Sequence, residues 1–233
     1  MSSGIKLLTF DLDNTLWDVN TVILNAEATM QAWLSVNYPQ WLNLGPQRLS
    51  ELRQHIYTQQ PNIRHDLTAL RKAVLLQLLQ ESGYTHAAAL SGANAAFDVF
   101  FQARNQVTFY DGVLPTLATL KNQHLLYALS NGNADIHQVG LGHVFTHHFS
   151  AASVGQAKPH PAMFEAALTH AGVSPESVVH IGDHPEQDVA AAQALGIRSI
   201  WINFDNQDWP LEKPADAEVK QFEQIKDILA QWR

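Results

Sequence analysis

The chain has 233 residues, a formal net charge of −8 and no cysteine. This length allows one core domain with an inserted second unit, and the negative charge argues against a nucleic-acid partner, which would require clustered Lys and Arg. The lack of cysteine excludes disulfides, thiolate zinc sites and cysteine nucleophiles, and it fits a reducing cytoplasm.

A short apolar run at residues 5–10 predicts a first strand, and two carboxylates, Asp11 and Asp13, follow it directly. The run is typical of a strand that is buried in a parallel sheet. In open α/β sheets ligands bind beyond the carboxyl ends of the strands, so both carboxylates are expected to face a site. The pair alone leaves metal binding, a turn and catalysis open.

The next part of the chain is predicted to be helical. No convincing strand pattern follows until about residue 107, although connections between strands and helices are usually only a few residues long. Helical patterns, separated by Pro and Gly, cover residues 20–36, 47–59, 67–79 and 93–104. We therefore expect an all-helical cap domain at residues 17–105, inserted into a core made of residues 1–16 and 106–233.

From Tyr110 onward, short apolar runs alternate with helical patterns, as in βαβ units. The apolar runs predict strands at residues 125–129, 149–154, 178–181 and 199–202. The helical patterns predict helices near residues 113–121, 134–140, 161–171, 186–195 and 222–232. The expected fold class is α/β, with a Rossmann-like parallel sheet as the core.

Polar residues follow three of these later strands. Ser130 and Asn131 offer a hydroxyl and backbone N–H groups, which fit either a helix cap or an anion site. Lys158 precedes a helix, where a positive charge is unfavourable, so it is either solvated or paired with an anion. Asp183 and Asp188 fit helix capping or a solvated first turn when each is taken singly. Capping alone does not readily explain why four strand ends carry, in chain order, a carboxylate pair, a hydroxyl, a lysine and further carboxylates.

Four segments resemble, in chain order, the four motifs of the haloacid dehalogenase-like hydrolase superfamily: Asp11-Leu12-Asp13-Asn14-Thr15, Ser130-Asn131-Gly132, Lys158-Pro159, and Gly182-Asp183 with Asp188. The helical insert resembles the cap of the subgroup that carries it after the first motif. Three segments are similar to bacterial phosphatases that act on flavin mononucleotide and a phosphorylated flavin precursor: Trp17-Asp18-Val19-Asn20, Asn131-Gly132-Asn133-Ala134 and Leu141-Gly142-His143-Val144-Phe145.

The resemblance implies a phosphatase that hydrolyses a small-molecule phosphate monoester. Asp11 would be the nucleophile that forms an aspartyl-phosphate, and Asp13 would serve as general acid and then as general base. Ser130, Asn131 and Lys158 would hold the phosphoryl oxygens. The substrate would be flavin mononucleotide or a riboflavin-pathway phosphate, with sugar or nucleoside phosphates as the alternative.

The resemblance also implies Mg²⁺, which prefers hard oxygen ligands. Its ligands would be Asp11, Asp183 and the backbone carbonyl of Asp13. Asp188 would lie behind them and hold Lys158 or metal-bound water. His184 departs from the family pattern, in which Ser, Asp or Asn often follows the metal-binding aspartate, and a surface position is expected for it.

Several alternatives remain open. His143, His147 and His148 have a helix-like spacing that could bind zinc, although surface positions are the simpler interpretation. Trp17 is expected to contact substrate. A 2-haloacid dehalogenase would share the aspartate nucleophile, but those family members lack the second aspartate of the first motif, which is Asp13 here.

A receiver-type signalling module would need only about half of this length, and the retained motif residues argue against an inactive binding protein. No run reaches the roughly 20 apolar residues that span a bilayer, so no membrane partner is expected. The residues before Asp11 also lack the hydrophobic stretch of a signal peptide, and a cytoplasmic location is expected. The sequence leaves a monomer and a homodimer equally open.

Overall fold

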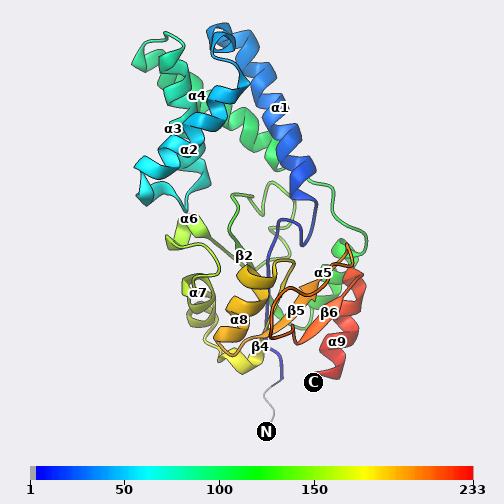
Figure 1. Cartoon of the computed structure of the whole chain (residues 1–233). Helices are drawn as coiled ribbons and strands as arrows, with labels where there is room; N and C mark the ends of the chain where they lie inside the picture. Colours follow the sequence, from blue (N-terminus) through cyan, green and yellow to red (C-terminus); the bar gives the residue numbers. More distant parts are fainter. Residues whose placement is uncertain (1–3, 233) are drawn as a thin grey trace. The chain divides into compact units, whose positions relative to one another are not determined.

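The computed structural model describes residues 4–232, and the chain divides into two compact units. The core unit joins the chain up to Val19 with the chain from Thr108 onward, and the helical unit is Asn20–Val107. In Figure 1 the helical unit takes up the blue-to-green part of the chain. Each unit has its own cluster of buried apolar side chains. That the helical unit serves as a cap domain stays a prediction.

The core unit is built on a parallel sheet, to which the described residues contribute six strands in the order β3-β2-β1-β4-β5-β6. The strands are β1 (Leu7–Phe10), β2 (Leu125–Ser130), β3 (His147–Ser150), β4 (Val178–Gly182), β5 (Arg198–Ile202) and β6 (Ala217–Val219). Because the fully buried β1 lies between β2 and β4, the residues that follow it reach the middle of the carboxyl edge. The predicted α/β fold with a Rossmann-like parallel sheet is confirmed.

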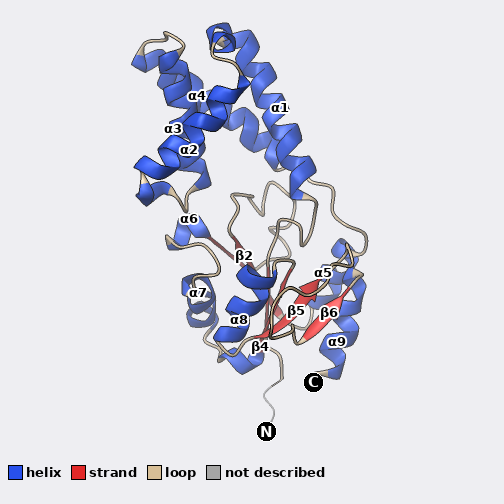
Figure 2. Ribbon diagram, viewed as in Figure 1, coloured by secondary structure: helices blue, strands red, loops and turns tan. Residues whose placement is uncertain are grey.

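Helices lie on both sides of this sheet, as Figure 2 shows. The covering helices are α5 (Val113–Leu120), α7 (Ala162–Ala171), α8 (Ala191–Ala194) and α9 (Ile225–Gln231). Leu7 packs in the cluster formed with α7 and α8. Phe10 faces the other side of the sheet, because side chains alternate between the two faces of a strand. Its ring lies 6.3 Å from the ring of Phe222, which comes just before α9.

The predicted strand at residues 149–154 is wrong in its second half. The strand is β3, and residues 151–154 form the short helix α6 (Ala151–Val154). The cause is a capping box: the hydroxyls of Ser150 and Ser153 each accept the other's backbone N–H, at 3.1 and 2.9 Å. Reciprocal capping satisfies two backbone donors and starts a helix where the apolar pattern favoured a strand.

The predicted helix at residues 134–140 is also wrong, because this segment forms turns. The Asp135 side chain accepts the backbone N–H groups of His137 and Gln138 at 2.8 and 3.4 Å, and such local bonds compete with a helix.

The helix expected near residues 186–195 is a π-helix, Pro185–Ala190, followed by α8. The sequence pattern missed β6 because this strand has only three residues.

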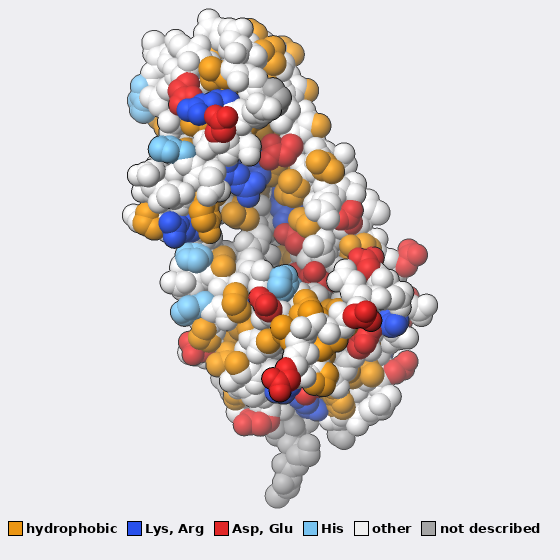
Figure 3. Space-filling view, viewed as in Figure 1, with side chains coloured by type: hydrophobic (Ala, Val, Ile, Leu, Met, Phe, Trp, Pro, Cys, Tyr) orange, Lys and Arg blue, Asp and Glu red, His pale blue; other side chains and the backbone are white. Residues whose placement is uncertain are grey.

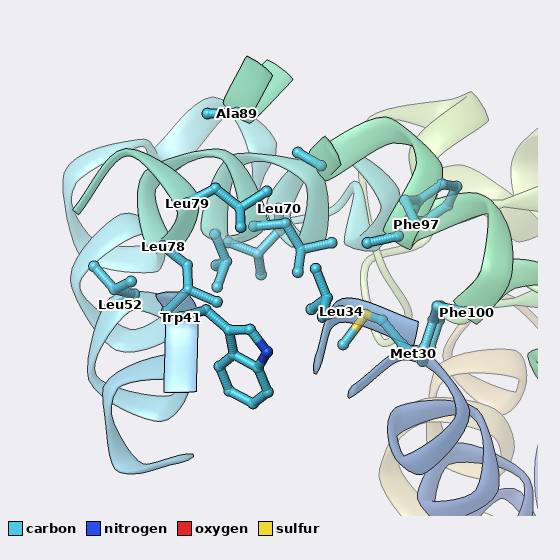
Figure 4. Close-up of a cluster of buried hydrophobic side chains, with 14 of the residues drawn as sticks. Met30, Leu34, Trp41, Leu52, Leu70, Leu78, Leu79, Ala89, Phe97 and Phe100 are labelled. Atoms are coloured by element: carbon cyan, nitrogen blue, oxygen red, sulfur yellow. The ribbon is translucent and has the colours of Figure 1, made fainter. Parts of the chain in front are cut away.

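The helical unit contains, among its described residues, helices and turns but no strand. Its α-helices are α1 (Val19–Asn37), α2 (Pro46–Gln59), α3 (Leu67–Glu81) and α4 (His86–Arg104). Their apolar faces meet in one core, where Leu34, Trp41, Leu79 and Phe100 are among the buried side chains (Figure 4). No helix in residues 4–232 is long and apolar enough to cross a membrane.

Helix α4 begins seven residues before the predicted residue 93, because Thr85 caps it by accepting the N–H of Ala88 at 3.4 Å. Gly92, which the sequence pattern predicts to break the helix, lies inside it. A Cβ at Gly92 would come within 2.5 Å of the Tyr38 ring, so glycine here allows close packing and does not end the helix.

Candidate active site

Asp11 follows β1 directly, and its backbone N–H donates to the Ile181 carbonyl of β4 at 2.9 Å, which continues the ladder and fixes its position. The residue is only 8% exposed. Its Oδ1 accepts from Lys158 Nζ at 2.7 Å, and its Oδ2 accepts from the Thr15 hydroxyl at 3.3 Å. Burial raises the pKa of Asp11 well above its ordinary value, although the Lys158 charge opposes that rise.

Asp13 is half-buried on the loop that follows β1. The loop turns back through Asn14, whose φ is 61° and whose backbone N–H donates to the Trp17 carbonyl at 2.8 Å. The Trp17 indole N–H donates to Asp13 Oδ1, also at 2.8 Å. Trp17 is 0% exposed and packs edge-on against Phe109. The indole therefore holds the Asp13 carboxylate in this structure, and the substrate contact expected of Trp17 stays a prediction.

Lys158 is buried, with 2% of its surface exposed, so it is not the solvated lysine that the sequence left open. Its ammonium donates to Asp11 Oδ1 at 2.7 Å, to Asp188 Oδ1 at 2.6 Å and to the Leu129 carbonyl at 2.7 Å. Burial alone would lower the pKa of Lys158, but the two carboxylates outweigh it and raise this pKa above the ordinary value. The ammonium is thus charged and tied to the end of β1.

Asp183 and Asp188 complete a compact acidic cluster. Oxygens of Asp11, Asp183 and Asp188 lie within 4.8 Å of one another, and no other such group of potential metal ligands occurs in the described part of the chain. Burial and the Asp188 charge raise the pKa of Asp183 to about 7. Burial opposes ionisation of Asp188 as well, yet Lys158 and His180 hold its pKa below the usual range. These oxygens could hold a divalent cation.

Asp188 is the member of this cluster whose oxygens already have several donors. Its Oδ1 contacts Lys158 Nζ and His180 Nε2, and its Oδ2 accepts the backbone N–H of His184 at 3.0 Å. Gly182 makes room for it, because a Cβ there would lie 2.4 Å from the Asp188 carboxyl carbon. Asp188 thus holds Lys158, and the position behind the metal ligands that the sequence suggested for it stays a prediction.

Ser130 and Asn131 end β2 beside Lys158. Ser130 is buried, and its hydroxyl accepts the N–H of Gly132 at 3.0 Å. The Asn131 amide accepts the Lys158 N–H at 2.7 Å and donates to the Lys158 carbonyl at 2.9 Å and to Gln187 Oε1 at 2.8 Å. Its side chain therefore joins the segment after β2 to the Lys158 loop and to the π-helix, a role that the sequence did not indicate. The phosphate contact predicted for Asn131 stays a prediction.

Sequence reasoning assigned no role to Thr9, Thr15 and His180. Thr15 donates to Asp11 Oδ2 and to Asp183 Oδ1, at 3.3 and 3.1 Å. His180 is buried in β4, with Nδ1 2.9 Å from the Thr9 hydroxyl and Nε2 3.1 Å from Asp188 Oδ1. The available signal was a histidine inside an otherwise apolar strand, two residues before Gly182.

The remaining histidines lie outside this cluster. His184 is exposed, and its Nδ1 accepts the backbone N–H groups of Glu186 and Gln187, so it caps the π-helix and does not enter the site. His147 and His148 are neighbours on β3, where side chains alternate between the two faces, and His143 is exposed on the loop before it. The helix-like spacing considered for a zinc site is therefore wrong.

The comparisons with known proteins agree on the family. The model for haloacid dehalogenase-like hydrolases matches residues 5–196. The 5-amino-6-(5-phospho-D-ribitylamino)uracil phosphatase YigB of Escherichia coli (strain K12) is 32% identical over 204 residues, which cover 88% of this chain and 86% of that protein. The phosphoserine phosphatase of Thermus thermophilus is 33% identical over 141 residues, 57% of this chain and 54% of that protein.

Among solved structures, a 2-haloacid dehalogenase from Pseudomonas syringae pv. Tomato DC3000 matches with a TM-score of 0.94 and 39% identity, covering 98% of this chain and 100% of that one. A family model that spans most of the chain and relatives that match over nearly its whole length leave no ambiguity at this level. The chain belongs to the haloacid dehalogenase-like hydrolase family.

Proposed function

We propose that the protein is a Mg²⁺-dependent phosphatase that hydrolyses a small-molecule phosphate monoester through an aspartyl-phosphate on Asp11. The observation that carries the proposal is the cluster of Asp11, Asp183 and Asp188 around the ammonium of Lys158. Three carboxylates with a single lysine repel an anionic substrate, so phosphate binding requires a further positive charge. The alternative of an unaided carboxylate attacking a phosphate dianion lacks that compensation.

The residues present fit Mg²⁺. The site offers only oxygen ligands, which this ion prefers. Burial and the nearby Asp188 charge raise the pKa of Asp183, and a bound cation would offset that cost to its ionised form. Asp11, Asp183 and the backbone carbonyl of Asp13 would hold the ion, since the Asp188 oxygens already accept from Lys158, His180 and His184. When bound, the ion neutralises phosphoryl charge and orients the ester.

The residues of the chain carry out the two chemical steps. An Asp11 oxygen attacks phosphorus, the bond from phosphorus to the leaving oxygen breaks, and Asp13 gives its proton to the departing alkoxide. Asp13 then takes a proton from water as that water attacks the phosphoryl group, and Asp11 is released. Lys158 stabilises charge on the phosphoryl oxygens, and Trp17 keeps the Asp13 carboxylate directed through its 2.8 Å bond.

The substrate that we assign is a ribityl phosphate with a flat ring, as in flavin mononucleotide or a riboflavin precursor. The support is the relative named for 5-amino-6-(5-phospho-D-ribitylamino)uracil, which matches over 88% of this chain. The residues around Asp11 handle only the phosphoryl group, so we assign the choice of leaving group to the helical unit. Sugar and nucleoside phosphates are the alternative substrates.

A second candidate function is dehalogenation of a 2-haloacid, because a structure so named matches at 39% identity and a TM-score of 0.94. Asp13 and the acidic cluster favour phosphorus chemistry over this alternative. The test is a panel of phosphate esters assayed for phosphate release with Mg²⁺ and with EDTA, beside 2-haloacids assayed for halide release. We expect phosphate release that EDTA abolishes; metal-independent halide release without phosphatase activity would contradict the proposal.

A further inference from the structure

His180 is a buried polar side chain behind the proposed catalytic residues. It is 1% exposed and packs edge-on against Phe164 of α7, in a strand whose other residues are apolar or glycine. A buried imidazole is costly unless both ring nitrogens are hydrogen-bonded. Both are: Nδ1 lies 2.9 Å from the Thr9 hydroxyl, and Nε2 lies 3.1 Å from Asp188 Oδ1.

The two partners determine which ring nitrogen carries the proton. Ionised Asp188 can only accept a hydrogen bond, so the Nε2 that faces it must donate. The Thr9 hydroxyl can donate to Nδ1, and its alternative acceptor, the Val179 carbonyl, is farther away at 3.5 Å. Burial lowers the pKa of His180 in spite of Asp188, which leaves the ring neutral. The arrangement therefore fits one tautomer, protonated at Nε2.

Asp188 then receives three donors that leave its carboxylate no freedom to rotate. Oδ1 accepts from His180 and Lys158, and Oδ2 accepts the His184 N–H at 3.0 Å. Lys158 in turn bridges Asp188 and Asp11 at 2.6 and 2.7 Å. A continuous chain of hydrogen bonds thus runs from Thr9 in β1, through His180, Asp188 and Lys158, to the carboxylate of Asp11.

We propose that His180 is a positioning residue: as the Nε2–H tautomer fixed by Thr9, it holds Asp188, and through Asp188 it sets the ammonium of Lys158 against Asp11. The catalytic part of this inference rests on the proposed phosphatase function. A purely structural histidine would fill space between the sheet and α7 equally well without its N–H. The inference predicts that the N–H at Nε2, and not the ring volume, is what matters.

The first test reads the tautomer directly by ¹⁵N NMR of the imidazole in the wild-type protein. We expect a protonated Nε2 and an unprotonated Nδ1 for His180. The signal is assigned by its loss in His180→Phe. A proton on Nδ1, or on both nitrogens at neutral pH, would overturn the proposal whether or not the protein is a phosphatase.

The second test compares two variants of His180 with a control elsewhere. His180→Gln keeps an N–H donor near the Nε2 position, whereas His180→Phe keeps the ring volume and removes the donor. His148→Gln is the matched control, because His148 lies on β3 and its buried Nε2 has no hydrogen-bond partner among residues 4–232. Melting temperatures are measured for all three, so that loss of folding is recognised.

We expect His180→Phe to lower kcat by roughly tenfold to a hundredfold with a smaller change in KM, and to weaken binding of inorganic phosphate in the presence of Mg²⁺. His180→Gln should recover most of both, and His148→Gln should change neither. Equal losses in the Gln and Phe variants, or no loss in Phe, would overturn the proposal. If the wild-type protein releases no phosphate from any ester, the proposed function fails, and the tautomer together with phosphate binding decides the positioning role. A wild-type protein that binds no phosphate would overturn that role.

Discussion

Asp11 combines two properties that oppose each other, since its carboxylate is buried and yet would have to be ionised for the attack on phosphorus that we propose. Burial raises its pKa, whereas the Lys158 ammonium at 2.7 Å favours the ionised form. A bound divalent cation would act in the same direction as Lys158. As a nucleophile, Asp11 would therefore depend on its positive neighbours. An amide at this position should keep the shape of the side chain but lose the ability to attack phosphorus.

The first prediction follows for Asp11→Asn. We expect the rate of phosphate release to fall by roughly a thousandfold or more, because an amide is a poor nucleophile toward phosphorus. Circular dichroism should show an unchanged fold. A pure, folded variant that retained appreciable turnover would remove Asp11 from the covalent step.

The second prediction concerns Asp13, which is expected to protonate the leaving oxygen. Asp13→Asn should slow single-turnover phosphorylation most for esters of basic alcohols, such as sugar phosphates, and least for an activated aryl phosphate. The measurement is a leaving-group series in the wild type and in the variant. Equal losses along the series would show that Asp13 is not the general acid.

The residues that we propose to react could be located from the sequence, whereas the side chains that hold them in place could not. Asp11 and Asp13 stand two positions apart after a recognisable strand, so a local pattern identifies them. The bonds of Asn131 to Gln187 and of His180 to Thr9 join residues that are 56 and 171 positions apart. Such pairs arise only when parallel strands bring their carboxyl ends together.

At the scale of elements, the long periodic helices and the central strands were predictable, and the short irregular ones were not. The interior strands β1, β2, β4 and β5 are mostly apolar, as expected for strands whose two faces are both covered. The edge strand β3 lacks that signal, since its four residues are His, His, Phe and Ser and all are half-buried. Its expected position was displaced toward residues that the Ser150 capping box turns into α6.

The third prediction concerns acid stability and belongs to β3. Burial lowers the pKa of His148 from 6.5 to about 4. Between these values the unfolded chain binds a proton at this position that the folded protein does not, so the contribution of His148 to the free energy of unfolding must fall as the pH drops through this window. His148 alone accounts for at most about 3 kcal/mol of that loss.

The measurement is urea unfolding of the wild type and of His148→Phe from about pH 7 to about pH 4, which spans the window between the two pKa values. The variant should lose less stability over this range and should be relatively more stable at the acid end. His147 and His180 shift in the same direction, so the difference between the two proteins is the quantity to compare. Parallel pH profiles would show that His148 does not contribute.

At the scale of the whole molecule, the proposed function requires the chain to bind an anion although its net charge is −8. Acidic side chains are scattered over the face of the core unit seen in Figure 3, so no broad positive surface attracts the substrate on that face. Attraction must then be local, at Lys158 and the bound cation that we propose. Because the helical unit has its own apolar core, its polar residues can be substituted without changing the side chains around Asp11.

The fourth prediction is that substrate choice favours a flat ring with a ribityl phosphate. The kcat/KM for flavin mononucleotide or for the phosphorylated ribitylaminouracil should exceed that for simple sugar phosphates by about tenfold or more, the smallest margin that pocket contacts commonly give. Steady-state kinetics on the same ester panel measures it. A preference for sugar phosphates would reject this substrate and leave the phosphatase assignment intact.

Attack of Asp11 on phosphorus is the central claim, and the configuration at phosphorus tests it most directly. The wild-type protein hydrolyses, in ordinary water, a thiophosphate monoester made chiral at phosphorus with ¹⁷O and ¹⁸O, and ³¹P NMR reads the configuration of the released thiophosphate. The account predicts net retention, because two displacements in sequence, first by Asp11 and then by water, each invert the phosphorus. Inversion would contradict it, because a single direct attack of water on the ester gives that result.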